Sequence, residues 1–418
     1  MRVVYLNPCG QLGGAETSLL EILASLRAAA PDWELWLVLG EDGPLAEEAR
    51  SLGVRVLLEH FPPALARLGD SQTGPLALLA QLARAAVASV RYKIRLARVV
   101  KSLHPDVIHS NGFKMHLLGA WTRPGRTPLA WHIHDYVSTR RLASRLLCLS
   151  QRASNVAIAN SQSVAADLRT LMPDLPIVPI YNAIDLDRFS TAGTKLDLDS
   201  LSGLPPAEPG TIRVGLLATF ARWKGQQVFL RALARLAPEV PIRGYIIGGP
   251  IYQTNGSQWS RQELEEQARS LGLERKVGFT GFVRDTPAAL RSLDIAVHAS
   301  TAPEPFGMVI IEAMACGKAV IAAQAGGASE LFTDGENALG HAPGDEAGLA
   351  RQILRLVDDR ELRERLGKAG RRAAETHFHG KRLAQELLAV YRKVGAIPDD
   401  SPSTAPTPQP TAAGSEVC

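Results

Sequence analysis

Residues 304–320 have the sequence EPFGMVIIEAMACGKAV, the most informative stretch of this 418-residue chain. Two glutamates, Glu304 and Glu312, stand on either side of Gly307, where a helix is predicted to begin. Glycine lets the backbone approach a ligand closely, and the free N–H groups of a first helical turn suit an anion. The two carboxylates can accept hydrogen bonds from hydroxyl groups. Phosphate combined with hydroxyls is the outline of a nucleotide-sugar.

Short runs rich in β-branched residues alternate with helical patterns on both sides of this stretch. The helical pattern MVIIEAMACG is preceded by the apolar run IAVHAS and followed by AVIAAQ, both typical of buried strands. This alternation recurs along most of the chain and predicts an α/β fold with two Rossmann-like β/α/β domains. Ligands of such sheets bind beyond the carboxyl ends of the strands, so the expected site is a central cleft between the domains.

The length of the chain exceeds that of one ordinary core, and its composition indicates where the domains divide. We predict an N-terminal domain over residues 1–190, a linker rich in Gly, Pro, Ser and Thr over 191–211, and a C-terminal domain over 212–376. An amphipathic helix within 377–396 is expected to pack back on the N-terminal domain. The proline-rich tail 397–418 is predicted to be disordered.

The bulk composition is that of a soluble globular protein, with 46% apolar and 21% charged residues and a net charge of +4. No nucleic-acid motif is present. The four cysteines are scattered without zinc-ligand spacing, so no metal site is expected. No uncharged apolar run is long enough to cross a bilayer. We expect a cytoplasmic protein, with peripheral attachment to the inner face of the membrane as an option.

Two turns between a strand and a helix are candidates for phosphate binding. Lys224 in LLATFARWKGQQ can place an ammonium group against phosphate, although it could equally be a surface lysine beside a helix cap. Gly13 and Gly14 in GQLGGAE permit close approach of the backbone to a phosphate or substrate. The second pattern is a weak signal by itself, because it is not G-x-G-x-x-G.

His134 follows the strand-like run PLAWHI and is a candidate hydrogen-bond donor or proton carrier, or else a capping or core histidine. His132 is expected to be structural because it lies inside the strand. The two glutamates also have alternatives, since Glu304 could be a solvated loop residue and Glu312 could lie on an exposed helix face. Apolar neighbours around Glu312 favour a partner or a function for its charge.

A basic region lies between Ser71 and Ala166, which holds 13 Lys/Arg and 2 Asp/Glu. The helix predicted from Pro75 to Leu103 carries an apolar stripe beside a basic one. A solvated helix face is one interpretation. The functional alternative is docking on an anionic membrane surface, or attraction of a phosphorylated acceptor. The basic stripe consists of Arg84, Arg91, Arg95 and Arg98.

Six patterns together give the chain a family resemblance: GGAE at 13–16, HD at 134–135, NAIDLDRF at 182–189, WKG at 223–225, the stretch at 304–320, and GGASELFTDGENAL at 326–339. The chain resembles the retaining glycosyltransferases of family 4, which have the GT-B fold, over most of residues 1–393. The resemblance implies that the C-terminal domain is the donor-binding domain, which holds most of a nucleotide-sugar, and that the N-terminal domain is the acceptor-binding domain. The donor is a co-substrate, and no cofactor is implied.

By position, the resemblance also implies roles for individual residues. Lys224 would bind the donor pyrophosphate, Glu304 the transferred sugar and Glu312 the ribose. His134 would lie at the reacting centre, and the catalytic set would be His134, Glu304 and Lys224. The backbone at Phe306, Gly307, Met308 and Val309 would meet the sugar and phosphate, and Gly13 and Gly14 would lie near the phosphate from the other domain. One departure is Thr219, where the family usually has an arginine, and Arg222 is the candidate to replace that charge.

The expected function is transfer of a sugar, with retention at the anomeric carbon, to a glycan or lipid-linked acceptor in cell-surface polysaccharide or glycolipid biosynthesis. No D-x-D motif follows a strand, so a divalent metal is not expected. The alternatives are a nucleotide-sugar epimerase of the same fold and a non-catalytic glycosyltransferase-like partner subunit. A glycoside hydrolase would leave the phosphate-binding features unused.

Overall fold

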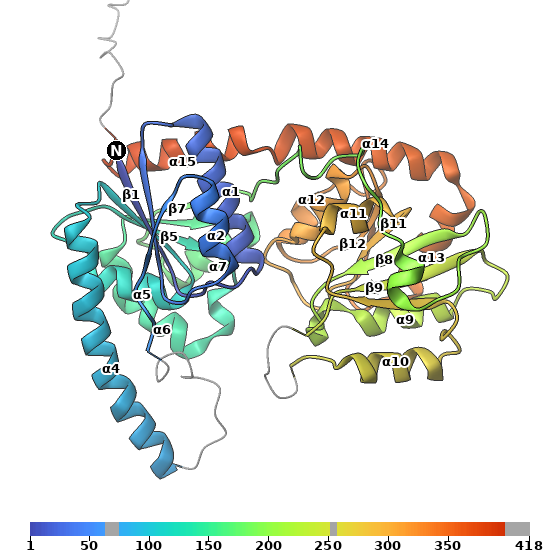
Figure 1. The fold of residues 1–418 in the computed structure, drawn as a ribbon, viewed down its shortest axis with the longest axis horizontal. Coiled ribbons are helices and arrows are strands. Elements are labelled where there is room, and N and C mark those ends of the chain that lie inside the picture. Colours follow the sequence, from blue (N-terminus) through green and yellow to red (C-terminus); the bar gives the residue numbers. More distant parts are fainter. Residues whose placement is uncertain (63–74, 251–256, 398–418) are drawn as a thin grey trace, which may run out of the picture.

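The computed structural model describes residues 1–62, 75–250 and 257–397, with the side chains of residues 75–87 left out. This part of the chain forms two α/β domains side by side, each built on one parallel sheet (Figure 1). The prediction of two Rossmann-like domains in a GT-B arrangement is therefore confirmed. The predicted tail from residue 398 onward lies outside the described residues.

The N-terminal sheet consists of apolar strands that are mostly buried on both faces, as expected where helices cover a parallel sheet on both sides. Tyr5 of one central strand lies beside His109 of the next, and the register continues to the following strand. The strands, in spatial order, are β3 (Arg55–Leu58), β2 (Glu34–Leu39), β1 (Arg2–Asn7), β4 (Val107–Asn111), β5 (Leu129–Ile133), β6 (Val156–Ala159) and β7 (Ile177–Pro179).

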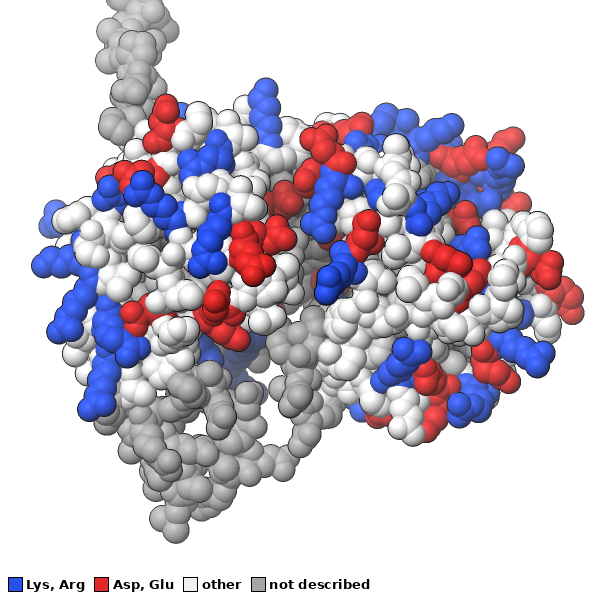
Figure 2. All heavy atoms as spheres, viewed as in Figure 1, with Lys and Arg blue, Asp and Glu red and all other residues white. Residues whose placement is uncertain are grey.

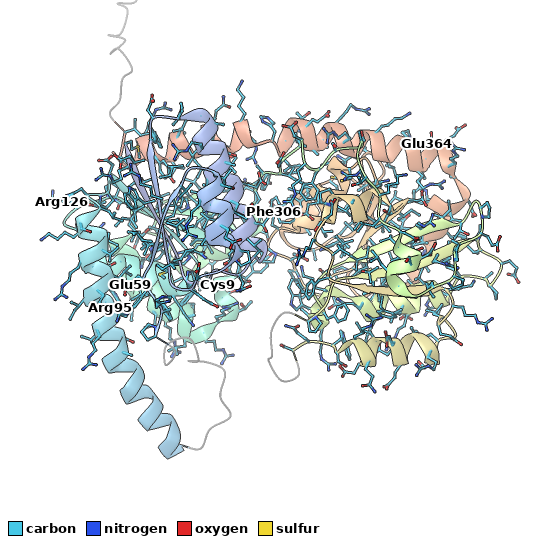
Figure 3. The ribbon with its side chains drawn as sticks, in the orientation of Figure 1. Cys9, Glu59, Arg95, Arg126, Phe306 and Glu364 are labelled. Atoms are coloured by element: carbon cyan, nitrogen blue, oxygen red, sulfur yellow. The ribbon has the colours of Figure 1, made fainter. Side chains whose placement is uncertain are left out.

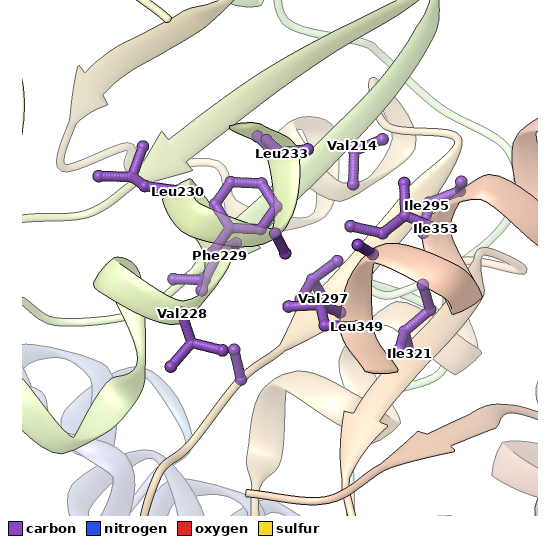
Figure 4. Packing of buried hydrophobic residues seen from close by; sticks show 14 of the residues in the cluster. Val214, Val228, Phe229, Leu230, Leu233, Ile295, Val297, Ile321, Leu349 and Ile353 are labelled. Carbon is purple, nitrogen blue, oxygen red and sulfur yellow. The ribbon is translucent and has the colours of Figure 1, made fainter. Parts of the chain in front are cut away.

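The C-terminal sheet repeats this design with six described strands. Its main core cluster packs Phe229 and Leu233 against Val214, Ile295 and neighbouring aliphatic side chains (Figure 4). Burial of this apolar surface is the main stabilising contribution to the domain. The strands, in spatial order, are β10 (Val277–Gly281), β9 (Ile242–Ile247), β8 (Ile212–Leu217), β11 (Ile295–His298), β12 (Ala319–Ala323) and β13 (Leu339–His341).

Helices connect the strands, and the last two run along one side of both domains (Figure 1). Leu383, Leu387 and Tyr391 of the final helix α15 belong to the N-terminal core, so the chain returns to its first domain. The helices are α1 (Gly14–Ala29), α2 (Pro44–Ser51), α4 (Pro75–Ser102), α5 (Phe113–Thr122), α6 (Arg141–Ser150), α7 (Gln162–Leu171), α8 (Leu198–Ser202), α9 (Gln226–Ala234), α10 (Arg261–Ser270), α11 (Thr286–Arg291), α12 (Met308–Ala315), α13 (Glu346–Asp358), α14 (Arg360–His377) and α15 (Gly380–Lys393).

The segment 191–211 carries structure of its own. Its helix α8 is capped by Asp197 and contributes Leu198 to the core of the C-terminal domain. The carboxylate of Asp199 lies 3.0 Å from Arg213 and 2.8 Å from Arg243, which fastens the segment to that domain. The domain boundaries stated above stay a prediction.

Candidate functional site

Glu304 is the centre of a buried polar cluster at the carboxyl ends of the C-terminal strands. It is only 6% exposed, and one carboxylate oxygen accepts a hydrogen bond from the ammonium group of Lys224. The other oxygen lies 2.6 Å from Nε2 of His298 and accepts a hydrogen bond from Ser300 Oγ at 2.5 Å. Glu304 is therefore no solvated loop residue.

The charge state of Glu304 follows from these partners. Burial by itself would raise the pKa of the carboxyl group, but the charges of Lys224 and His298 and their hydrogen bonds outweigh burial and hold that pKa well below its usual range. Glu304 is thus an ionised hydrogen-bond acceptor at neutral pH. A carboxylate in this state cannot serve as a general acid, but it can hold hydroxyl groups.

Lys224 is placed by a turn that only glycine permits. It ends the 3₁₀ turn η3 (Arg222–Lys224), which separates β8 from α9. The next residue, Gly225, has φ +80°, and a Cβ there would lie 1.8 Å from the carbonyl oxygen of Ala299. The backbones of the two loops therefore touch, which brings the lysine side chain to Glu304.

The amino end of α12 has the uncapped geometry that the sequence predicted. Gly307 is the N-cap residue, with φ +101°, and no described side chain caps the helix. The N–H groups of the first turn, which begins at Met308 and Val309, are thus available to a ligand. Phe306 packs 6.1 Å from the ring of Tyr181, a residue that precedes the C-terminal domain, and Figure 3 shows it near the boundary between the domains.

Glu312 lies further along α12, among groups from both domains. Burial raises the pKa of its carboxyl group to about 7, and the positive charge of Arg188 partly opposes this shift. Burial likewise raises the pKa of Glu21, on α1, to about 7, with Asp185 and Glu312 contributing. The charge of Glu312 thus acts on Glu21, so the two glutamates approach each other from the two domains.

The motif around Asn182 joins the two helices that would face the donor. Ser18 Oγ of α1 donates to Asn182 Oδ1 at 2.7 Å, and Asn182 Nδ2 donates to Met308 Sδ of α12 at 3.6 Å. Gly13 is the N-cap of α1, and a Cβ added at Gly14 would meet no atom within 4 Å. The amino end of α1 is therefore open at Gly14.

His134 follows β5 and stacks on His132, with ring centroids 4.2 Å apart and an angle of 25° between the planes. Its Nε2 atom is buried and has no hydrogen-bond partner among the described residues. Burial lowers the pKa of His134 to about 4, so the ring is neutral at physiological pH. A neutral ring suits a hydrogen-bonding role better than that of a proton donor.

Two contacts between the domains involve residues given no site role from the sequence. Tyr136 OH donates to the backbone carbonyl of Glu304 at 3.3 Å. Glu330 accepts the backbone N–H groups of Gln162 at 2.8 Å and Ser163 at 2.7 Å, at the start of α7, and the hydroxyl of Tyr181 at 2.9 Å. Glu330 thus caps a helix that belongs to the other domain.

Thr219, which stands where the family usually has an arginine, and the nearby Arg222 both contact other residues of the C-terminal domain. The carbonyl oxygen of Thr219 accepts a hydrogen bond from Gln226 Nε2 at 2.7 Å. The guanidinium of Arg222 lies 3.6 Å from the ring centroid of Trp259 and 3.4 Å from Glu263, so its contacts are with the start of α10. A phosphate-binding role for Arg222 stays a prediction. No described group of three His, Cys, Asp or Glu residues could hold a metal ion.

His298 and Ser300 were missed because the apolar run IAVHAS predicts only a strand. Its polar members lie at the carboxyl end of β11, as His134 does after β5. That shared position was the available signal, since parallel strands bring their carboxyl ends to one edge of the sheet.

The basic stripe of α4 is only partly free. Arg95 lies 2.6 Å from Glu59 and over the ring of Tyr92, as Figure 3 shows for the first pair. Arg91 and Arg98 are exposed, together with apolar Val90 and Ile94. Figure 2 shows Lys and Arg side chains gathered on the outer side of the N-terminal domain, where α4 lies. The side chain of Arg84 lies outside the described residues. Among the described helices none is long and apolar enough to cross a membrane.

The fold and this site define a two-domain GT-B protein, and comparison with known protein families identifies the family to which it belongs. The sequence-family model described as glycosyltransferase family 4 matches residues 12–188, and the family model described as glycosyl transferases group 1 matches residues 206–373. The chain belongs to the group 1/family 4 glycosyltransferases.

Individual relatives are moderately similar. The N-acetyl-alpha-D-glucosaminyl L-malate synthase of Bacillus anthracis is 27% identical over 58% of this chain and 60% of its own length, so the match spans about three fifths of that relative. The lipopolysaccharide core biosynthesis mannosyltransferase LpsB of Rhizobium meliloti is 28% identical over 66% of this chain and 83% of its own length. The crystal structure of Anabaena HepE in complex with UDP has a TM-score of 0.76 and 27% identity, covering 94% of this chain and 100% of that one.

Proposed function

We propose that this protein transfers a sugar from a nucleotide-sugar donor to a glycan or lipid-linked acceptor, with retention at the anomeric carbon. The observation that carries the proposal is the ionised, buried Glu304, held by Lys224 and His298 beside the uncapped amino end of α12. Family membership supports the reaction class. HepE also has structures in complex with UDP-glucose, and these favour a uridine diphosphate sugar as the donor.

The donor would lie along α12 in the order sugar, diphosphate, ribose. Lys224 pairs with Glu304 in this structure, so an incoming diphosphate would compete for the ammonium group. The diphosphate would also receive N–H groups from Met308 and Val309 at the helix start. Glu304 would then accept hydrogen bonds from sugar hydroxyls, and Glu312 from the ribose.

In the reaction, the bond from the anomeric carbon to the diphosphate oxygen breaks and the acceptor oxygen bonds to the same face of that carbon. The leaving diphosphate gains negative charge, which Lys224 and the amino end of α12 are placed to stabilise. A phosphate oxygen of the donor would take the acceptor proton. Neutral His134 would hydrogen-bond near the sugar, since the low pKa set by its burial removes it from proton transfer.

The acceptor and its location are inferred from the N-terminal surface. Leu142 and Leu149 of α6 are 74% and 83% exposed, beside the exposed Arg141 and Arg145. A helix with leucine and arginine side chains exposed together is typical of attachment to an anionic membrane surface. The similarity to LpsB, named for lipopolysaccharide core biosynthesis, supports a cell-surface glycan as acceptor.

The reaction is tested by incubating the protein with a panel of nucleotide-sugars and measuring nucleotide release with and without lipid-linked acceptors. Acceptor-dependent release supports transfer. A new sugar isomer without nucleotide release would instead show an epimerase, and donor binding without turnover would show a partner subunit. The anomeric configuration of the product, from its proton NMR coupling, tests retention.

Membrane attachment is tested separately with vesicles of anionic and of neutral phospholipid. We expect sedimentation with anionic vesicles that weakens as salt is raised. Leu149→Ser should weaken it, whereas Leu354→Ser, at an exposed leucine on α13 of the other domain, should not. Binding unaffected by anionic lipid or salt would contradict this part of the proposal.

A further inference from the structure

A buried chain of polar side chains crosses the N-terminal sheet and ends at His134. Its members lie on different elements: His109 on β4, His132 on the neighbouring β5, and Tyr391 on the final helix α15. All three are at most 1% exposed, within a core that is otherwise mainly apolar. Burying polar groups costs free energy unless they are hydrogen-bonded, so the hydrogen bonds among these side chains are a specific feature of the fold.

Hydrogen bonds join these three side chains in a continuous series. Tyr391 OH lies 2.7 Å from His109 Nδ1, and His109 Nε2 lies 3.1 Å from His132 Nδ1. His132 then stacks on His134. We call Tyr391, His109 and His132 the histidine relay.

The two hydrogen bonds restrict the proton positions on the rings. If Tyr391 donates to Nδ1 of His109, that ring carries its proton on Nε2 and donates to Nδ1 of His132, which must then also carry its proton on Nε2. If Tyr391 accepts instead, both rings carry the proton on Nδ1. Burial keeps both rings neutral by lowering their pKa values. In either direction the two histidines have the same tautomer.

We propose that His132 is the positioning residue of His134, and that Tyr391 and His109 hold it in one tautomer and one ring plane. The stacked contact would transmit that fixed plane to His134, whose buried Nε2 has no hydrogen-bond partner among the described residues. This inference rests on the proposed function for the role of His134. The final helix thereby acts on the reacting centre, which it does not itself form.

A matched pair of tyrosines tests the relay. Tyr391→Phe removes the hydroxyl that faces His109. Tyr5→Phe removes an equally buried hydroxyl from the same core, 3.1 Å from Tyr391, and leaves the bond from Tyr391 to His109 in place. Both are single-atom deletions that keep the ring, so both proteins should fold, and thermal unfolding compares their stability.

Proton–nitrogen NMR of protein labelled at histidine nitrogen tests the structural part without any activity. We expect His109 and His132 to be neutral and in the same tautomer near neutral pH. Tyr391→Phe should change the ring nitrogen shifts of both His109 and His132, and Tyr5→Phe should change them less. Opposite tautomers, or a change confined to His109, would overturn the proposal.

Kinetics test the functional part. Tyr391→Phe should lower kcat by on the order of tenfold with little change in donor KM, while Tyr5→Phe should lower it less than about twofold. In a His134→Ala background Tyr391→Phe should have no further effect on kcat, because its action passes through His134. An equal loss in both backgrounds would show a merely structural role. Absence of transfer by the unmodified protein would refute the proposed function, while the NMR result would still stand.

Discussion

Lys224 donates a hydrogen bond to Glu304 from the turn after β8, which joins the cation expected at the diphosphate to the carboxylate expected at the sugar before any ligand is bound. The charge and hydrogen bond of Lys224 help to keep the buried carboxylate of Glu304 ionised. An incoming donor diphosphate must replace the contact of Lys224 with Glu304 by its own contact with Lys224. The affinity for nucleotide alone therefore reflects the difference in free energy between these two strong contacts.

Gly307 should be required both for the fold and for the anion site. Gly307→Ala places a side chain at φ +101°, which costs about 1–3 kcal/mol, with the new Cβ 3.0 Å from Ile310 Cδ1. The matched control is Gly335→Ala, at φ +77° with no atom within 4 Å. Both should lower Tm, but calorimetry should show lost nucleotide affinity only for Gly307→Ala. Equal affinities in the two variants would argue against a phosphate at the start of α12.

Gly14→Ala should not destabilise the ligand-free protein, but it should weaken donor binding. No atom lies within 4 Å of the added Cβ, and Gly14 begins α1, where alanine favours a helix. Tm should therefore stay the same or rise. Donor affinity should fall if the diphosphate lies against this backbone. Unchanged affinity, measured by calorimetry, would remove α1 from the donor site.

Glu312 should make nucleotide affinity depend on pH near neutrality. The ionised carboxylate accepts hydrogen bonds from ribose hydroxyls, so bound nucleotide lowers its pKa from about 7 and affinity falls as pH drops. The fall should approach about tenfold per pH unit well below that pKa and vanish in Glu312→Gln. Glu21→Gln should retain most of the dependence.

The raised pKa of Glu312 also predicts how the stability of the folded protein depends on pH. Because the pKa of Glu312 in the folded protein is above the ordinary value of 4.5, protonation favours the folded state, and the advantage is lost as pH rises through about 7. Glu312→Gln should thus raise Tm above about pH 7 more than below it. The opposite sign would contradict the burial of this carboxyl group.

Glu330 should hold the two domains together. Glu330→Ala removes the acceptor for two N–H groups at the start of α7, a loss of about 1–2 kcal/mol for a helix cap. We expect a lower Tm and a larger radius of gyration by X-ray scattering. Ser329→Ala, at the exposed neighbour whose hydroxyl donates to the carbonyl of Gly326 in its own turn, is the control. Identical scattering for both variants would show that the contact does not set the domain arrangement.

The sequence predicts the fold well because buried parallel strands leave continuous apolar runs, as in 295–300 and 319–324. Strand ends are harder to predict, since β7 stops at Pro179 within the apolar run PIVPIYNA, and Tyr181 beyond it contacts Phe306 of the other domain. Segment 191–211 shows another limit, since its glycines and prolines hide the short helix α8 and the ion pairs of Asp199.

The candidate site was predictable where residues are close in sequence, as at Gly307 and Glu312. The contacts of Glu304 with Lys224, of Glu330 with α7 and of Tyr391 with His109 join residues 80, 168 and 282 positions apart. No local pattern encodes such contacts, because they depend on how the sheets and domains assemble.

Donor turnover by Lys224→Ala tests the central claim most directly. The comparison is with Lys276→Ala, since the ammonium group of Lys276 donates to the carbonyl of Pro238 at the protein surface. With the acceptor and nucleotide-sugar identified from the panel, we expect Lys224→Ala to lower kcat by on the order of 10²–10³-fold, and Lys276→Ala to leave it unchanged. Near-normal transfer by a folded Lys224→Ala protein would contradict the assignment of this site.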